Sequence, residues 1–450
     1  MKNTDREDSP ARVAATPKQA GETRSPWGWV ERSVWTERML LRLTQGGPAN
    51  RVWFSLVDKT YAPANLQSAW ERVQRNGGSA GVDRQGIEHF ARQSAVELTR
   101  LAEQLRQNTY RPQPVRRAWI PKPGSQEQRP LGIPAVRDRI VQAALRHVLE
   151  PIFEAEFAEH SYGFRPGRGA KDALRRVDAL LKGGQTWVVD ADLRRYFDTI
   201  PQEKLLALIE ARVADGRVLA LVESFLRAGV LEEGQEWQPT EGGTPQGGVI
   251  SPLLANVYLN PLDHQMARAG YEMVRYADDF VILCRSEAEA QAALATVAAW
   301  VAEAGLTLHP TKTRVVDATQ PGGFDFLGYH FERGQRWPRK KSWEGLKERV
   351  RAKTRRTDGR SFQAIIADLN RTLRGWYGYF QHSKANTFKT VDGFVRRRLR
   401  SLLQKRRGKT RHGNGAAHQR WPNAWFAQNG LLSLEAEHLW TRTIVLRRTH

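Results

Sequence analysis

Two adjacent carboxylates, Asp278 and Asp279, stand between two short, mainly apolar runs at residues 274–277 and 280–283. Apolar residues running into and out of a polar pair predict a β-hairpin with the acids at its turn. Neighbouring carboxylates repel each other, and a bound cation relieves that repulsion. Mg²⁺ prefers hard oxygen ligands of this kind. Taken alone, the pattern equally fits a solvated turn, because Asp is a favoured turn residue.

A second acidic strand favours the chemical interpretation. Residues 186–193 are rich in strand-forming side chains and contain Asp190 and Asp192, which share one face of a strand. Two acidic strand ends about 85 residues apart in the chain meet only if their strands lie side by side in one sheet. Three carboxylates at such a meeting point would hold two divalent ions roughly 3.5–4 Å apart, which suits in-line phosphoryl displacement.

The order of the motifs resembles the reverse transcriptases encoded by bacterial group II introns. The tetrapeptide Tyr276-Ala277-Asp278-Asp279 is similar to the reverse transcriptase signature. Four further blocks stand in the matching order at residues 129–134 (RPLGIP), 161–168 (SYGFRPGR), 243–254 (GTPQGGVISPLL) and 326–329 (FLGY). A lone Asp pair would be weak, but five ordered blocks are specific. The resemblance covers roughly residues 60–425.

The resemblance implies an α+β right-hand polymerase. Residues 61–335 would form fingers and a palm, with an antiparallel palm sheet flanked by helices. Residues 336–430 would form an all-helical thumb and maturase-specific RNA-binding domain. Residues 1–60 would be a partly disordered N-terminal extension, and residues 431–450 a C-terminal tail. Group II intron proteins often add an HNH endonuclease domain with paired Cys-x-x-Cys sites, and we expect none here because the sequence has one cysteine.

The resemblance also assigns the catalytic residues. Asp192, Asp278 and Asp279 would be the catalytic acids and would bind two Mg²⁺ ions, with Mn²⁺ as a possible substitute. The backbone carbonyl of Leu193 would be a further metal ligand. Asp190 is left out of this set because the family tolerates other residues at its position.

Five residues are expected to contact the incoming nucleotide. Lys122 and Arg129 lie on the two arms of a predicted β-hairpin, where cations would neutralise triphosphate charge. By resemblance, Phe197 excludes the sugar 2′-hydroxyl and Gln246 contacts the nucleotide near its sugar. Lys312 matches a family lysine near the nucleotide. Plain packing of Phe197 and a solvated hairpin are the structural alternatives, and residues 245–248 are expected to open a helix that continues to residue 259.

Two basic segments are candidates for nucleic-acid contact. The loop at residues 160–169 mixes glycines, aromatic residues and the arginines Arg165 and Arg168, although a structural loop explains either arginine nearly as well. Residues 394–411 hold nine Lys or Arg and no acid, alongside an apolar stripe. An amphipathic helix with a basic outer face is predicted there. Its candidate contacts with RNA are Arg396, Arg397, Arg400, Lys405 and Arg406.

Composition limits the class of protein. The formal net charge of +22 over 450 residues favours a polyanionic partner. No apolar run approaches the roughly 18 residues of a membrane-spanning helix, and the polar N-terminus shows no signal peptide. A cytoplasmic protein without membrane contact is therefore predicted. Residues 1–25 are expected to be disordered, residues 36–60 and 137–158 helical, and residues 202–228 a pair of helices.

The function implied is RNA-directed DNA synthesis by a protein that also binds its intron RNA. Its partners would be intron RNA, an RNA template, a DNA primer or target, and dNTPs. The same protein would assist splicing and retrohoming. Two alternatives are a maturase that only assists splicing and a domesticated reverse transcriptase serving DNA repair or phage defence. An RNA-synthesising polymerase fits less well because of Phe197.

Overall fold

A four-stranded antiparallel sheet carries the acidic residues. The computed structural model describes residues 27–45, 52–121, 128–232, 242–408 and 415–448. The sheet has the order β5-β6-β3-β7. Its strands are β5 (Glu272–Tyr276), β6 (Asp279–Cys284), β3 (Trp187–Asp192) and β7 (Arg314–Asp317). This is the expected palm sheet, and the acids of β3 and β6 lie on neighbouring strands.

Both faces of the palm sheet are buried, in separate cores. Val188 and Val189 follow each other on β3, so their side chains point to opposite faces. Val189 joins a core shared with helices α11 (Ser251–Arg268) and α12 (Glu287–Glu303). Val188 joins a core shared with helix α7 (Ala170–Lys182). The near-continuous apolar composition of these strands reflects burial on both faces.

Helices of the N-terminal half pack around one long buried helix. Almost all of α6 is buried, as its apolar stripe predicted. The indole of Trp35 is also buried and donates to the carbonyl of His147 on α6 at 2.9 Å, which anchors the first described segment. The helices of this half are α1 (Glu37–Gln45), α2 (Val57–Tyr61), α3 (Pro63–Asn76), α4 (Ile87–Arg92), α5 (Ser94–Arg106), α6 (Val136–Glu154), α8 (Tyr196–Thr199), α9 (Gln202–Glu210) and α10 (Gly216–Leu226).

Two smaller sheets contain the other named strands of the described residues. The expected fingers hairpin pairs β1 (Val115–Pro121) with β2 (Gln128–Ile133), and β4 (Val230–Leu231) joins β1. A third sheet has the order β10-β9-β8. Its strands are β8 (Phe324–Phe326), β9 (Tyr329–Glu332) and β10 (Gln335–Pro338). The α+β class predicted from the sequence is therefore confirmed.

All regular elements in the described residues of the C-terminal part are helices. Its helices are α13 (Lys340–Lys353), α14 (Phe362–Phe380), α15 (Asn386–Arg406), α16 (Gly415–Arg420), α17 (Asn423–Gln428) and α18 (Leu434–Arg448). Residues 431–450 were expected to be a tail, but helix α18 packs on α15. The buried carboxylate of Asp392 on α15 accepts from the backbone nitrogen of Leu434 at 2.9 Å and the hydroxyl of Ser433 at 2.6 Å, which fixes the start of α18.

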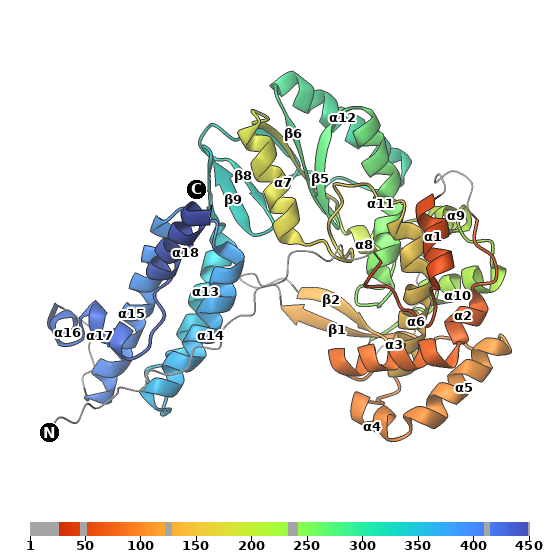
Figure 1. The fold of residues 1–450 in the computed structure, drawn as a ribbon, viewed down its shortest axis with the longest axis horizontal. Helices are drawn as coiled ribbons and strands as arrows, with labels where there is room; N and C mark the ends of the chain where they lie inside the picture. Colours follow the sequence, from red (N-terminus) through yellow and green to blue (C-terminus); the bar gives the residue numbers. More distant parts are fainter. Residues whose placement is uncertain (1–26, 46–51, 122–127, 233–241, 409–414, 449–450) are drawn as a thin grey trace, which may run out of the picture.

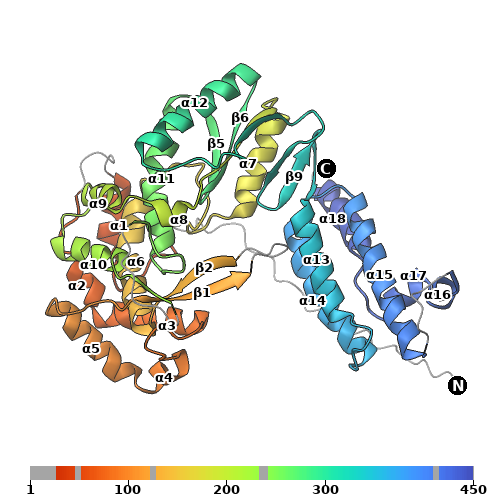
Figure 2. The same ribbon diagram turned by 180° about the vertical axis from the view of Figure 1, so that it is seen from behind.

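Figure 1 shows the C-terminal helices and the N-terminal helices on opposite sides of the palm sheet, with the β1–β2 hairpin extending between them. Figure 2 shows the same arrangement from behind. This is the fingers, palm and thumb arrangement expected from the sequence. The predicted disorder of residues 1–25 lies outside the described residues. Within the part of the chain that the structure describes, no helix is both long and apolar enough to cross a membrane.

The glycine-rich segment before α11 corrects one predicted boundary. The helix was expected to open at Pro245, but α11 begins at Ser251. Gly247 has a φ of +110°, which a helix does not allow, and a Cβ there would lie 2.2 Å from the carbonyl oxygen of Gly132. The backbone nitrogen of Gly132 donates to the carbonyl of Gln246 at 2.6 Å. Residues 245–248 therefore form a tight turn pressed against strand β2.

Candidate active site

The catalytic acids predicted from the sequence lie at one end of the palm sheet. Asp192, the last residue of β3, is the direct partner of Asp279, the first residue of β6. Tyr276 also pairs with Asp279, so Ala277 and Asp278 form a two-residue turn between β5 and β6. Ala277 has a φ of +60°, the left-handed conformation that such turns require. Leu193 follows Asp192 and forms an isolated bridge with Leu308.

A buried arginine supports this turn from behind. Arg275 is fully buried, and its guanidinium donates at 2.8 Å to the carbonyl of Ala277 within the turn. The same group donates to both carboxylate oxygens of Asp263 and, at 3.0 Å, to the Asn256 side chain on α11. A buried charge of this kind is stable only when it is paired and fully hydrogen-bonded. The conformation of the turn is therefore set by a network inside the protein.

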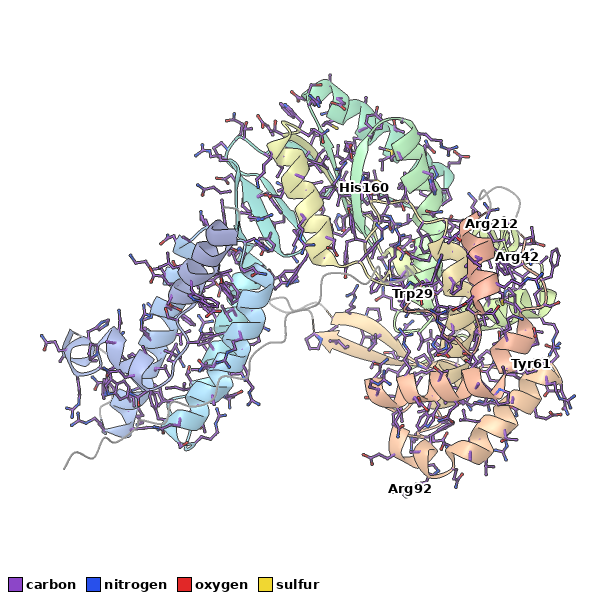
Figure 3. All side chains as sticks on the ribbon, viewed as in Figure 1. Trp29, Arg42, Tyr61, Arg92, His160 and Arg212 are labelled. Atoms are coloured by element: carbon purple, nitrogen blue, oxygen red, sulfur yellow. The ribbon has the colours of Figure 1, made fainter. Side chains whose placement is uncertain are left out.

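A second segment, residues 160–163, runs alongside β5. The backbone nitrogen of Tyr162 donates to the carbonyl of Arg275 at 2.9 Å, and the nitrogen of Arg275 donates to the carbonyl of His160 at 3.0 Å. Figure 3 places His160 beside the palm strands. A Cβ on Gly163 would lie only 2.3 Å from the backbone nitrogen of Ala277. The glycine thus lets this segment touch the catalytic turn.

The carboxylates at this end are costly to ionise. Burial, followed by the negative charges of Asp190 and Asp278, raises the pKa of Asp279 to about 7. Burial likewise raises the pKa of Asp278, against the effect of the Arg129 guanidinium. Burial raises the pKa of Asp190 to about 6, although Arg314 opposes it. A cation placed among these oxygens would relieve both the repulsion and the lost hydration.

Two basic side chains already contact the acids. Lys312 Nζ lies 2.6 Å from Asp192 Oδ2, and Arg314 Nε lies 3.3 Å from Asp190 Oδ2. The Lys312 side chain is 60% exposed, so its pairing with Asp192 is weak and easily exchanged. Among the residues that the structure describes, no three His, Cys, Asp or Glu side chains are arranged as a metal-binding cluster. The chemistry of the donors still fits Mg²⁺, because they are carboxylates at one end of the sheet, and burial and mutual repulsion raise the pKa values of Asp278 and Asp279.

Two of the predicted nucleotide-contacting residues share a cavity. Phe197 and Gln246 line one cavity of about 260 Å³, together with residues of the fingers hairpin such as Gly132. The Gln246 side chain donates to Asp198 Oδ1 at 3.4 Å. Arg129 on β2 is close enough to act on the pKa of Asp278. Lys122 lies outside the described residues.

The arginines of the 160–169 loop have structural partners. Arg165 is buried, donates through Nε and Nη2 to the carboxylate of Glu154, and donates through Nη1 to the carbonyls of Ala158 and Ser161. The structural alternative therefore fits Arg165 better than a phosphate contact, because its guanidinium is enclosed and its donors are used. Arg168 is half-buried and donates to the carbonyl of Glu159.

The basic residues predicted on the outer face of α15 fall into a buried group and an exposed group. Arg400 is buried and donates to the carbonyl of Trp421 at 2.9 Å and to the Asn423 side chain at 2.8 Å, which favours a structural role over the predicted RNA contact. Arg396 is largely buried, 3.8 Å from Asp392. The remaining candidates on this helix, Arg397, Lys405 and Arg406, are exposed.

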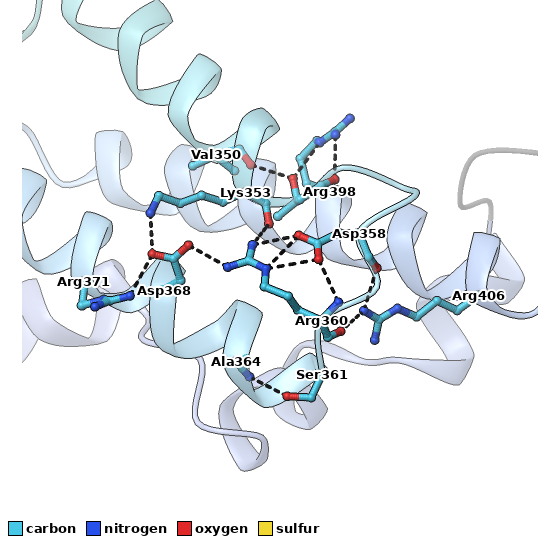
Figure 4. A network of polar contacts seen from close by, with 11 residues as sticks. Val350, Lys353, Asp358, Arg360, Ser361, Ala364, Asp368, Arg371, Arg398 and Arg406 are labelled. Carbon is cyan, nitrogen blue, oxygen red and sulfur yellow. Dashed lines mark hydrogen bonds and ion pairs between the residues drawn. The ribbon is translucent and has the colours of Figure 1, made fainter.

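A polar network holds the far end of these helices. Figure 4 shows Arg406 donating to the backbone carbonyls of Asp358 and Arg360. Arg360 pairs with Asp358 at 2.8 Å and with Asp368 at 3.1 Å. Part of the positive charge in this region therefore joins helices α14 and α15. Arg397 and Lys405 make fewer hydrogen bonds and ion pairs with the protein, and they remain the better candidates for RNA contact.

Two functional neighbours were missed or underrated from the sequence. Asp190 was set aside, yet it is the charge that most strongly raises the pKa of Asp279. Its position two residues before Asp192 on a strand was the available signal. Arg275 was passed over as an ordinary strand residue. A charged residue inside an otherwise apolar strand was the signal that it has a buried partner.

Comparison with known proteins agrees with this geometry. Residues 120–331 match the family described as reverse transcriptase (RNA-dependent DNA polymerase), and residues 343–421 match the group II intron, maturase-specific domain. Protein YkfC of Escherichia coli (strain K12) is 35% identical over 292 residues, which cover 56% of this chain and 76% of YkfC. The chain belongs to the group II intron reverse transcriptase and maturase family. Its palm acids and helical C-terminal part are the features of that family expected from the sequence.

Another relative of this chain is longer. Group II intron-encoded protein LtrA of Lactococcus lactis subsp. cremoris is 43% identical over 170 residues. That alignment covers 38% of this chain, and the chain spans only 28% of the length of LtrA. Among solved structures, a chain of a Cas6-RT-Cas1–Cas2 complex is 25% identical, with a TM-score of 0.37 over 55% of this chain and 41% of that chain.

Proposed function

We propose that this protein is an RNA-directed DNA polymerase that extends a DNA primer on an RNA template and also binds a group II intron RNA. The observation that carries the proposal is the pairing of Asp192 with Asp279 across β3 and β6, with Asp278 at the adjoining turn. In the reaction, the primer 3′-hydroxyl attacks the α-phosphate of a dNTP, and pyrophosphate leaves. Divalent ions held by these carboxylates would activate the hydroxyl and steady the leaving oxygen.

Each nearby side chain has a role in this proposal. Arg129 would neutralise triphosphate charge, and Lys122 would do so from the other arm of the hairpin. Phe197 would close the cavity beneath the sugar against a 2′-hydroxyl, and Gln246 would hold the nucleotide. Lys312 would leave Asp192 and turn to phosphate, which its exposure permits.

The maturase-specific match at residues 343–421 supports the second half of the proposal. The protein would bind its intron RNA through the C-terminal helices, assist splicing and support retrohoming into DNA. The formal net charge of +22 suits a polyanionic partner of this size. A maturase that only assists splicing would have no need of Asp192, Asp278 and Asp279 at one end of the palm sheet, where burial makes Asp278 and Asp279 costly to ionise.

The test is primer extension on poly(rA)/oligo(dT) with Mg²⁺. Asp278→Asn should lower extension by at least about 1000-fold while leaving RNA affinity unchanged, because amide oxygens are poor substitutes for a carboxylate at a divalent ion. Asp58→Asn, a change at an exposed acid on α2, is the matched control and should extend like wild type. Extension by Asp278→Asn at the wild-type rate would refute the site. A folded, RNA-binding wild type that does not extend would leave the splicing-only maturase.

A further inference from the structure

A second cavity, of about 350 Å³, lies outside the catalytic site, where β10 meets the C-terminal helices. One wall comes from the end of β10 and the start of α13. The other wall comes from the residues that join α14 to α15 and from the first turn of α15. The lining residues are Trp337, Pro338, Lys340, Trp343, Lys384, Asn386, Thr387 and Thr390. We call this cavity the Trp337 pocket.

The Trp337 pocket presents aromatic rings next to ammonium groups. Trp337 and Trp343 are each only half-buried. The ammonium of Lys384 lies 3.5 Å from the centroid of the Trp337 ring, and Lys347 lies 5.0 Å from the centroid of the Trp343 ring. Large aromatic rings that stay partly open to water are available for stacking on a flat ligand.

The charge around the pocket is strongly positive. Residues 336–349 hold six Lys or Arg and two Glu, and residues 381–391 hold two Lys and no acid. One of the two acids, Glu344, is already paired with Lys347 at 2.6 Å. This charge opposes a cationic ligand and favours an anionic one. Phosphate groups next to the pocket would meet Lys340 and Lys384, which are exposed.

Polar groups complete a set suited to a nucleobase. The side-chain amide of Asn386 has no hydrogen-bond partner among the described residues, and it offers both donors and an acceptor. Amides of this kind form hydrogen bonds with the edges of unstacked bases, and aromatic rings stack on the faces of those bases. Residues 343–390 of the pocket also fall inside the maturase-specific match.

We propose that the Trp337 pocket receives one unpaired nucleotide of an RNA strand. The base would stack on the Trp343 ring, Asn386 would bond its edge, and Lys340 and Lys384 would contact the flanking phosphates. The inference rests on the proposed RNA-binding function but does not depend on polymerase activity. Failure of the catalytic test would therefore leave it standing, because its own test measures binding alone.

The first experiment uses the wild-type chain, so it does not depend on how a variant folds. A 12-nucleotide oligo(rU) carrying one 4-thiouridine is bound, irradiated and digested, and the crosslinked peptide is identified by mass spectrometry. Crosslinks should map to the peptides that contain Trp337, Trp343 or residues 384–390. Crosslinks confined to other peptides would overturn the proposal.

The second experiment measures affinity for the same oligo(rU) by fluorescence anisotropy at 150 mM KCl. Trp343→Ala should weaken binding by roughly 10-fold, as loss of one stacked base does, and Asn386→Ala by a smaller factor. Trp440→Ala removes a 64% exposed tryptophan on α18 and should change nothing. Because Asn386 is exposed, its variant keeps the fold if Trp343→Ala does not.

Two further nucleic acids test which feature of the ligand the pocket binds. A blunt RNA duplex without unpaired nucleotides should bind the wild type and Trp343→Ala equally, because it has no free base to insert. Oligo(dT) of the same length should lose a similar factor in the variants, because the proposed contacts reach the base and the phosphates and not the sugar 2′-hydroxyl. An equal loss with the duplex, or no loss with oligo(dT), would overturn an unpaired nucleotide as the ligand.

Discussion

The acids of the palm place charge where the folded protein least tolerates it. Asp279 is half-buried and stands near three other carboxylates, and the Asp190 charge adds most to the pKa after burial itself. Such an arrangement is unfavourable until a cation arrives. A proton therefore competes with a divalent ion for Asp279, and the competition matters most below pH 7.

The same reasoning predicts a change of stability. The pKa of Asp279 is raised from 3.8 to about 7 in the folded protein, so the folded state holds this proton more tightly than the unfolded state. The resulting decrease in the free energy of unfolding is absent below about pH 4, grows as the pH rises, and is complete above pH 7. Asp279→Asn removes it and should raise the free energy of unfolding by about 4 kcal/mol at pH 8 in EDTA, since each pKa unit corresponds to about 1.4 kcal/mol.

Urea unfolding at pH 4.5 and pH 8 measures this effect. The gain from Asp279→Asn should be small at pH 4.5, where the wild-type carboxyl is largely protonated in the folded state. Mg²⁺ should stabilise the wild type at pH 8 and have little effect on the variant. Asp58→Asn, at a carboxylate whose side chain is 54% exposed, serves as the control. An equal gain at both pH values would show that the Asp279 charge is not the cause.

At the scale of elements, three segments distant in the chain fix the catalytic turn. Strand β5 supplies Arg275, helix α11 supplies Asp263 and Asn256, and the 160–163 segment lies against the turn itself. Asn256 also donates to the carbonyl of Gly163 at 2.8 Å, so the helix and the segment are joined. The turn is thereby held in its left-handed conformation before any ligand binds.

Gly163 tests this support. In Gly163→Ala, the new Cβ would lie 2.3 Å from the backbone nitrogen of Ala277, so the turn or the segment must shift. A displacement near 1 Å is enough to cost roughly 100-fold in the rate of a positioned reaction. We expect kcat for primer extension to fall by about that factor, with a smaller change in the affinity for primer–template.

The matched control is Gly169→Ala in the same loop. There the nearest atom to an added Cβ is Asp172 Oδ2 at 3.8 Å, an ordinary contact. This variant should extend primers at the wild-type rate. A Gly163→Ala variant with unchanged kcat would show that contact between this segment and the turn does not position the acids.

Local patterns were enough to predict the strands and their acids. The apolar runs around Asp278 and Asp279 identify a hairpin, and the neighbouring acidic strand follows from the same pattern. The start of α11 was not predictable in this way. Gly247 adopts a φ of +110° because the carbonyl of Gly132, more than 100 residues earlier, occupies the space beside it.

The roles of individual arginines were harder to predict for a related reason. A guanidinium in a basic segment looks the same whether it meets a phosphate or a buried partner. Arg165 finds Glu154 on the preceding helix, and Arg400 finds the carbonyl of Trp421 beyond the end of its own helix. Only the tertiary packing separates these two from exposed cations such as Arg397.

At the scale of the whole molecule, the net charge of +22 does not measure the RNA-binding surface. Arg165, Arg275 and Arg400 are all buried cations with protein partners. Their charges contribute to the total but meet no phosphate. The salt dependence of RNA binding should therefore report only the exposed subset, because it counts the counterions that the protein displaces from phosphates.

Arg397 and Arg400 separate these two uses of charge on one helix. Each phosphate contact adds about 0.7–0.9 to the slope of log affinity against log salt concentration. Arg397→Ala should lower that slope by about this amount for an RNA ligand and leave the Tm unchanged, because the side chain is exposed.

Arg400→Ala should leave the slope unchanged. It should lower the Tm by several degrees, since the carbonyl of Trp421 and the Asn423 side chain lose a buried donor worth about 1–3 kcal/mol. Titrations between 100 and 400 mM KCl, with thermal unfolding of the same samples, measure both quantities. A fall in slope for Arg400→Ala without a change in Tm would mean that this arginine reaches RNA, and that the packing of α15 opens when RNA binds.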